Sequence, residues 1–456
     1  MSAARGGAEG VPMSSRRAAW FWGGISTGAA PYLLAITMAG RAAQNMGQTT
    51  YPLIARQLLD VGNGTLGAMP AAAGLAAVVT AATLAARATS TSAWAMLTAG
   101  QSLIFISFVL LALPTGVAGL WTGALLLGVG GGLAMPTTMT MIGSAPVERR
   151  ARALAVYALS LSAGLVVGPL LESGVLHLLS GSLRAAFVAM LPLPLLATLL
   201  SAIAWRRRPA VGQGSPGSLP ELGVDEGAGR EAGAGVADLL AHEPGLERRA
   251  GLLRYSAYRL ALATQLTYQA PFAAVVTFGA LLARRVDGTS AAGASLAFTV
   301  FFTVSLAFRS AVVASPTRHR RFALVASVLA TAAGLAVLGG GRGVTYLLVG
   351  MAVLGAPHGL TFSLASGILA EGVPPQVLGR ANSRLLASTN LATIAVPFAC
   401  GWLAGSLGYR AMFLTLEVPT GVFGGILLLA LRRPLTGGRR RRAGGLAATD
   451  VPDPAS

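Results

Sequence analysis

Residues 260–283 read LALATQLTYQAPFAAVVTFGALLA and contain no charged side chain. A helix needs about 20 apolar residues to cross a hydrocarbon core of roughly 30 Å. The segment is long enough for this, and an arginine pair follows it at Arg284 and Arg285. It therefore predicts one transmembrane helix.

Uncharged intervals of similar length recur along the chain. Six of them predict one span each: 61–86, 185–205, 288–308, 322–341, 343–370 and 385–409. The interval 88–147 is long enough for two spans, with a turn at 114–116. Only 11% of the 456 residues are charged and the mean hydropathy is +0.66, whereas soluble proteins carry about 25% charged residues. The composition excludes a soluble enzyme or a disordered scaffold.

Three further spans contain ionisable residues. We expect them at about 32–55 with Arg41, at 153–179 with Glu172, and at 411–431 with Glu417. The total is twelve transmembrane helices, so the expected fold is an all-α integral membrane protein.

Arginine placement predicts the orientation of these spans, because cytoplasmic loops are enriched in basic residues. With both termini in the cytoplasm, 27 of the 34 basic residues are cytoplasmic, six are external, and Arg41 is intramembrane. The arginines come in short bursts between apolar stretches, which argues against a nucleic-acid-binding face. The single cysteine, Cys400, excludes disulfides within the chain and cysteine metal sites.

One long hydrophilic segment, 206–250, divides six spans from six and is expected to be a flexible cytoplasmic linker. The expected organisation is a cytoplasmic tail (1–30), a six-helix bundle (31–205), the linker, a second bundle (251–432) and a basic cytoplasmic tail (433–456).

The two halves repeat in sequence, which predicts pseudo-symmetric bundles. Arg152-Ala153 recurs as Arg380-Ala381, and Pro169 recurs as Pro397, both 228 residues later. Further matches at nearly the same offset are Asp60 with Asp287, and Arg184-Ala185-Ala186-Phe187 with Arg410-Ala411-Met412-Phe413.

Two six-helix halves joined by a cytoplasmic linker resemble the major facilitator superfamily of secondary transporters. The resemblance covers roughly residues 32–432. The loop after the second span keeps Leu84, Ala85 and Arg87 of a family motif but lacks its acid and both glycines. The fourth span keeps glycines and a proline at 128, 130 and 136.

The fifth span contains Gly164, Gly168 and Pro169, which resemble the family's Gly-x-x-x-Gly-Pro antiporter motif. Small residues at this spacing let helices approach closely. The resemblance implies alternating access, and this motif favours an exporter.

Polar residues on two spans form the predicted substrate site. Charged groups inside a bilayer are expensive to insert, so they suggest a function. Arg41 is expected to hold a polar or anionic group of the substrate, unless it snorkels to the cytoplasmic edge. The hydrogen-bonding residues of the predicted site are Asn45 and Gln48 on the first span and Gln265, Tyr268 and Gln269 on the seventh.

Two residues are candidates for proton coupling. Glu172 could carry a proton, or it could be a structural carboxylate bonded across a helix interface. His358 could exchange protons near neutral pH, or it could only pack. Glu417 is interpreted as structural or interfacial.

The function that we expect is proton-coupled export of a small amphiphilic metabolite, antibiotic or drug. The alternatives are uptake of a polar metabolite by proton symport and a non-transporting membrane sensor or assembly protein. We expect a monomer in a bacterial plasma membrane that contacts solute, protons and lipid but no nucleic acid. No catalytic residue, cofactor or metal is expected, because no nucleophile–base pair or metal-ligand cluster is visible in the sequence.

Overall fold

The computed structural model describes residues 30–85, 92–113, 115–143, 147–207, 251–314 and 320–432, which contain helices and no strand. Two compact units divide the chain: residues 1–61 with 72–237, and residues 62–71 with 238–456. Both predicted tails, apart from Ala30 at the end of the first, lie outside the described residues. So do Arg87 and the predicted linker beyond Arg207.

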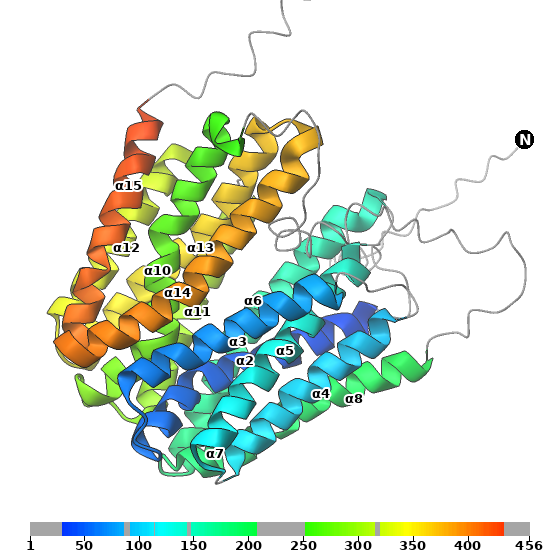
Figure 1. The fold of residues 1–456 in the computed structure, drawn as a ribbon, viewed down its shortest axis with the longest axis vertical. Helices are drawn as coiled ribbons and strands as arrows, with labels where there is room; N and C mark the ends of the chain where they lie inside the picture. The colour runs from blue at the N-terminus through cyan, green and yellow to red at the C-terminus, as the bar shows by residue number, and fades with distance from the viewer. Residues whose placement is uncertain are drawn as a thin grey trace, which may run out of the picture. The chain divides into compact units, whose positions relative to one another are not determined.

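The first unit contains long helices joined by short connections (Figure 1). They are α2 (Ala30–Gln57), most of α3 (Asn63–Thr83), α4 (Ala93–Ala112), α5 (Gly116–Gly143), α6 (Val147–Leu178), α7 (Leu183–Met190) and α8 (Pro192–Arg207). Each of these helices coincides with all or part of an uncharged or nearly uncharged interval of the sequence.

The second unit repeats this pattern after a short 3₁₀ turn, η3 (Leu252–Arg254). Its helices are α10 (Ser256–Arg285), α11 (Ala291–Ala314), α12 (Arg320–Gly340), α13 (Val344–Gly372), α14 (Pro375–Thr415) and α15 (Glu417–Leu431). Buried leucines from α12, α13 and α14, including Leu324, Leu364 and Leu385, pack with α10 in one core.

Two of the expected spans are interrupted. The span expected at 185–205 is divided into α7 and α8 at Leu191, just before Pro192, which lacks a backbone N–H. The span expected at 411–431 begins in the last residues of α14 and continues as α15 after Leu416. Just before it, the backbone of α14 turns at Gly408 with φ 82°. Glycine adopts a positive φ without steric cost, so Gly408 allows the chain to change direction there.

Ten helical segments in the described part of the chain are long and apolar enough to cross a membrane. They are Asn63–Thr83, Ala93–Ala112, Gly116–Ile142, Val156–Leu178, Leu183–Arg207, Ser256–Arg285, Ala291–Val312, Arg320–Gly340, Val344–Gly372 and Arg380–Leu431. The more polar α2 is not among them, and the last segment contains both α14 and α15.

Glycines bring neighbouring helices into backbone contact within each unit. An added Cβ on Gly100 of α4 would lie 2.8 Å from the Gly130 carbonyl oxygen of α5. On α13, a Cβ at Gly355 or Gly359 would lie 2.4 or 2.3 Å from carbonyl oxygens of α11. Helices pack this closely in membranes where small residues face each other.

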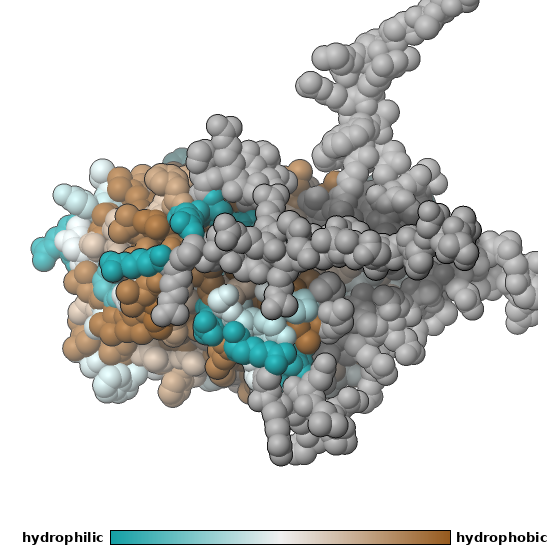
Figure 2. Space-filling view, turned by 90° about the horizontal axis from the view of Figure 1, so that it is seen from above, coloured by the Kyte–Doolittle hydropathy of each residue, from teal (hydrophilic) through white to brown (hydrophobic). Residues whose placement is uncertain are grey.

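Apolar side chains cover much of the outer surface. Phe322, Leu391 and Trp402 are each at least 67% exposed. Figure 2 shows apolar residues over much of the described surface that this view presents, with hydrophilic patches between them. An apolar exterior on apolar helices is what a lipid environment requires.

Candidate functional site

The glycines of the fifth expected span face α2 in the first unit. A Cβ on Gly164 would lie 2.7 Å from the Met38 carbonyl oxygen, and one on Gly168 would lie 2.4 Å from that of Ala42. Neither position has room for a larger residue. The Gly-x-x-x-Gly spacing therefore allows α6 to pack in direct contact with the backbone of α2.

Asn45 completes this α2–α6 contact. Its side chain is 2% exposed, and its Nδ2 donates to the Leu165 carbonyl oxygen of α6 over 2.8 Å. The residue four positions after Leu165 is Pro169, which has no N–H to give that carbonyl. Asn45 thus supplies the hydrogen bond that the proline of the motif removes.

Arg41 lies one helical turn before Asn45 and is partly buried. Its Nη1 donates to Oε1 of Gln44 over 3.2 Å, and its Cβ lies beside Gly164. Arg41 is therefore a cation held against α6. Gln48 lies on α2, but its side chain lies outside the described residues.

Glu172 is completely buried between α6 and α2. Its carboxyl oxygens Oε1 and Oε2 are hydrogen-bonded to the hydroxyls of Thr50 and Thr49, respectively. The sequence singled out the carboxyl but not its two partners. The adjacent hydroxyl pair on the first expected span was the available signal.

His358 lies in an aromatic cluster of the second unit. Its ring stacks on Phe272 with centroids 4.4 Å apart and meets Phe301 at 5.3 Å. Tyr268 and Phe302 complete the cluster, each with its centroid 5.8 Å from the histidine ring. The cluster joins α10, α11 and α13. The phenylalanines escaped the sequence analysis because aromatic residues in apolar spans are ordinary core residues.

The three polar residues expected on the seventh span lie along α10. Gln265 is buried, and Gln269 donates from Nε2 to Oγ1 of Thr393 on α14 over 2.5 Å. Tyr268 is 3% exposed, and its hydroxyl has no hydrogen-bond partner in the part of the chain that the structure describes. The structure therefore brings Tyr268 and His358 together, and directs Gln269 toward a neighbouring helix.

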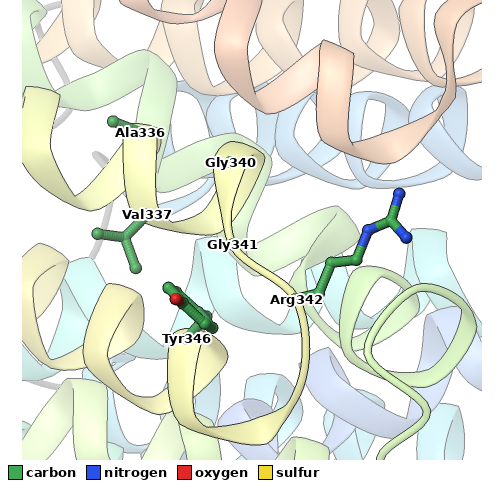
Figure 3. A pocket seen from close by; sticks show the side chains of 6 residues that line it. All are labelled: Ala336, Val337, Gly340, Gly341, Arg342 and Tyr346. Carbon is green, nitrogen blue, oxygen red and sulfur yellow. The ribbon is translucent and has the colours of Figure 1, made fainter.

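A surface hollow of about 490 Å³ lies at the junction of α12 and α13. Its lining includes Val337, Arg342 and Tyr346, and Figure 3 shows the Arg342 side chain pointing away from Val337 and Tyr346. No residue of the predicted site lines this hollow.

Asp287 lies in the turn between α10 and α11, near the Gly343 backbone and Arg410. Its Oδ1 accepts the Gly343 N–H over 3.1 Å. Burial raises the pKa of Asp287, and the Gly343 hydrogen bond and the charge of Arg410 oppose that rise. No group of three or more potential metal-ligating residues occurs among the described residues.

The family model of the Major Facilitator Superfamily matches residues 33–308 and 261–451. The chain belongs to this superfamily. It is accordingly a multi-pass membrane protein of a transporter family, as the sequence resemblance implied. No protein with a curated description matches it in sequence.

Solved structures of several transporters share the fold of this chain. The nucleoside transporter NupG, as its D323A mutant, gives a TM-score of 0.67 at 14% identity, covering 88% of this chain and 100% of its own. A POT family transporter in complex with a thioalcohol-conjugated peptide gives 0.66 at 16%, covering 89% and 96%. A bacterial homolog of the human lysosomal transporter Spinster gives 0.63 at 13%, covering 89% and 96%. These likenesses establish the fold alone.

Proposed function

We propose that this chain exports a small amphiphilic metabolite, antibiotic or drug in exchange for protons. The observation that carries the proposal is Glu172, a carboxyl with no exposed surface inside a helix of membrane-spanning length. Ionisable groups are costly at such positions, and carboxyls there commonly form part of proton pathways. The Gly-x-x-x-Gly-Pro motif beside it supports export.

The aromatic cluster supports an amphiphilic solute. Phe272 on α10 and His358 on α13 provide aromatic ring faces. The Tyr268 hydroxyl and the Gln265 amide, also on α10, provide hydrogen-bonding groups. Small-molecule sites typically combine an apolar lining with a few polar groups that orient the ligand. On this proposal His358 is a second candidate for proton exchange, and Arg41 holds a polar or anionic part of the solute.

The proposed topology has twelve crossings with both termini in the cytoplasm. The ten apolar segments, α2, and a division of Arg380–Leu431 at Gly408 give this number. The protein would act as a monomer in a bacterial plasma membrane, because a single chain carries both halves of the repeat.

Uptake of a polar metabolite by proton symport is the second candidate. The polar residues of α2 favour it, because nutrient sites need dense hydrogen bonding. The titles of the neighbouring structures name nucleoside and peptide transporters, and do not specify a direction for this chain.

The deciding experiment compares small molecules inside and outside cells of the native host with and without the intact gene. A compound that accumulates inside and disappears from the medium on deletion supports export. A compound left unconsumed in the medium supports uptake. That compound is then tested in proteoliposomes with an imposed pH gradient. Gradient-driven movement supports proton coupling, and no flux of any compound class would favour the sensor or assembly role instead.

A further inference from the structure

Glu172 ends a chain of hydrogen-bonding groups on α2 that includes a backbone carbonyl. The Thr49 hydroxyl contacts Oε2 of Glu172 and also lies 3.1 Å from the Met46 carbonyl oxygen. The Thr50 hydroxyl contacts the other carboxyl oxygen, Oε1. The two threonines and the carboxyl are all at most 2% exposed.

The burial of Glu172 and its contacts with the two threonines favour one protonation state. A threonine hydroxyl has one proton to donate, and a carbonyl oxygen can only accept. If Thr49 donates to Met46, its oxygen must accept from Oε2, and the carboxyl then carries the proton. If Glu172 is ionised, Thr49 must turn to the carboxylate and abandon Met46. An ionised carboxylate would also be buried at considerable cost.

We propose that the buried Glu172 is a neutral carboxylic acid positioned by Thr49 and Thr50, with Oε2–H donating to Thr49, Thr49 donating to Met46, and Thr50 donating to Oε1. When the proton leaves, Thr49 reverses its hydroxyl and donates to the carboxylate. Thr49 is thus a positioning residue that serves both protonation states of one carboxyl.

Release of the proton requires α2 and α6 to separate. The O–H bond at Oε2 breaks, its electron pair stays on Oε2, and the proton passes to a water molecule that reaches the carboxyl. No surface of Glu172 is accessible while Gly168 lies against Ala42 one turn away. The close α2–α6 contact therefore retains the proton, and its opening exchanges it.

Other ionisable groups lie on the elements packed against this site. α2 contributes Arg41, Tyr51 and Arg56, and α7 contributes Arg184. Arg41 is eight residues before Thr49, about 12 Å along the helix axis. Arg56 donates to Asp60 and to the Val61 carbonyl. α5 carries no ionisable side chain, and the nearest on α6 itself is His177, five residues on.

The second half of the repeat offers a comparison without a carboxyl. Cys400 follows Pro397 at the spacing by which Glu172 follows Pro169, and it is 1% exposed. Thr277 lies 228 residues after Thr49, is also buried, and donates to the Ala273 carbonyl of its own helix over 2.9 Å. The proton-holding arrangement thus belongs to the first unit, and Thr277 is a matched control for Thr49.

The experiment is infrared spectroscopy of the purified full-length protein over a range of pH, which detects the C=O stretch of a protonated carboxyl. We expect a band near neutral pH that disappears in Glu172→Gln. In Thr49→Val both forms of the carboxyl lose a hydrogen bond, and the ionised form loses the stronger, charge-assisted one. The band should therefore persist to a pH about one unit higher. Thr49→Ser should restore the original titration, and Thr277→Val should leave it unchanged.

Two results would overturn the inference. One is identical carboxyl spectra of the parent protein and Glu172→Gln near neutral pH, which would mean that Glu172 is ionised. The other is an equal shift of the band in Thr49→Val and Thr277→Val, which would remove the special role of Thr49. Thr49→Ser and Glu172→Gln keep the size and polarity of the site, so the test survives if Thr49→Val fails to fold.

The transport role of this proton rests on the proposed function, whereas its presence on Glu172 does not. If the band behaves as expected but transport does not depend on the pH gradient, Glu172 is protonated as inferred and the proposed proton coupling is wrong. If transport follows the gradient in Glu172→Gln as well, coupling uses another group.

Discussion

Asn45 on α2 donates its side-chain amide to the Leu165 carbonyl on α6, four residues before Pro169. The second unit has a related contact: Gln269 on α10 donates to the side chain of Thr393, four residues before Pro397. In the first unit the amide reaches the carbonyl that the proline leaves without a donor, whereas in the second it reaches the side chain of the residue at the corresponding position. Both amides belong to the predicted substrate site, and in this structure each donates to a neighbouring helix.

The first prediction is that Asn45→Ala lowers the free energy of unfolding by about 1–2 kcal/mol, because the Leu165 carbonyl loses its donor. In a Pro169→Ala background, residue 169 regains an N–H for that carbonyl. The cost of Asn45→Ala should then shrink. Thermal unfolding of the four proteins in detergent gives this double-mutant cycle. Strict additivity would show that Asn45 does not serve the proline site.

The second prediction concerns Gly168. Gly168→Ala should destabilise the protein by about 1–3 kcal/mol, because its Cβ would overlap the Ala42 carbonyl. Gly174→Ala on the same helix is the control, since its Cβ would meet nothing within 4 Å. Alanine has the higher helix propensity, so Gly174→Ala should be neutral or stabilising. Equal losses in thermal stability would contradict the close approach at Gly168.

The helices were predictable because crossing a bilayer imposes length and apolarity on a segment regardless of its neighbours. The contacts of Asn45 and Gln269 with neighbouring helices were not predictable. A polar stripe has the same sequence whether it lines a cavity or hydrogen-bonds an adjacent helix. The partners of Glu172 required knowing which faces of α2 and α6 meet. Gly164 and Gly168 indicated that α6 has a close neighbour but not which helix it is.

The third prediction is a pH dependence from Asp287. Its pKa is raised in the folded protein, chiefly by burial, so its contribution to stability is fully present below the unfolded pKa and is lost as pH rises through the folded pKa. Asp287→Asn should therefore melt at a higher temperature than the parent at neutral pH. The difference should close below about pH 4, near the ordinary aspartate pKa.

Asp287→Ala is the control for this pH effect, because it removes the acceptor of the Gly343 N–H that asparagine keeps. It should lose stability at every pH. A parent protein that becomes more stable relative to Asp287→Asn as the pH rises would reverse the sign and contradict the burial effect.

The fourth prediction concerns orientation. A reporter fused after Arg442 should be active only in its cytoplasmic form, because basic residues concentrate on the cytoplasmic side of the proposed topology. A second fusion in the loop that contains Asp287 should be active only in its extracellular form. Extracellular activity after Arg442 would require a different number of crossings.

The fifth prediction concerns the Tyr268 hydroxyl, which is buried without a partner. Tyr268→Phe should leave thermal stability unchanged or raise it in the absence of solute, because an unpaired buried hydroxyl costs about 1–3 kcal/mol. Tyr409 donates its hydroxyl to Oδ1 of Asn63 over 2.8 Å, so Tyr409→Phe should lose stability. If the Tyr268 hydroxyl bonds the solute, Tyr268→Phe should weaken solute binding about fivefold or more, since one such bond contributes about 1 kcal/mol or more. Melting curves and transport KM for both variants separate the two roles, and an equal stability loss in both would mean that the Tyr268 hydroxyl has a protein partner.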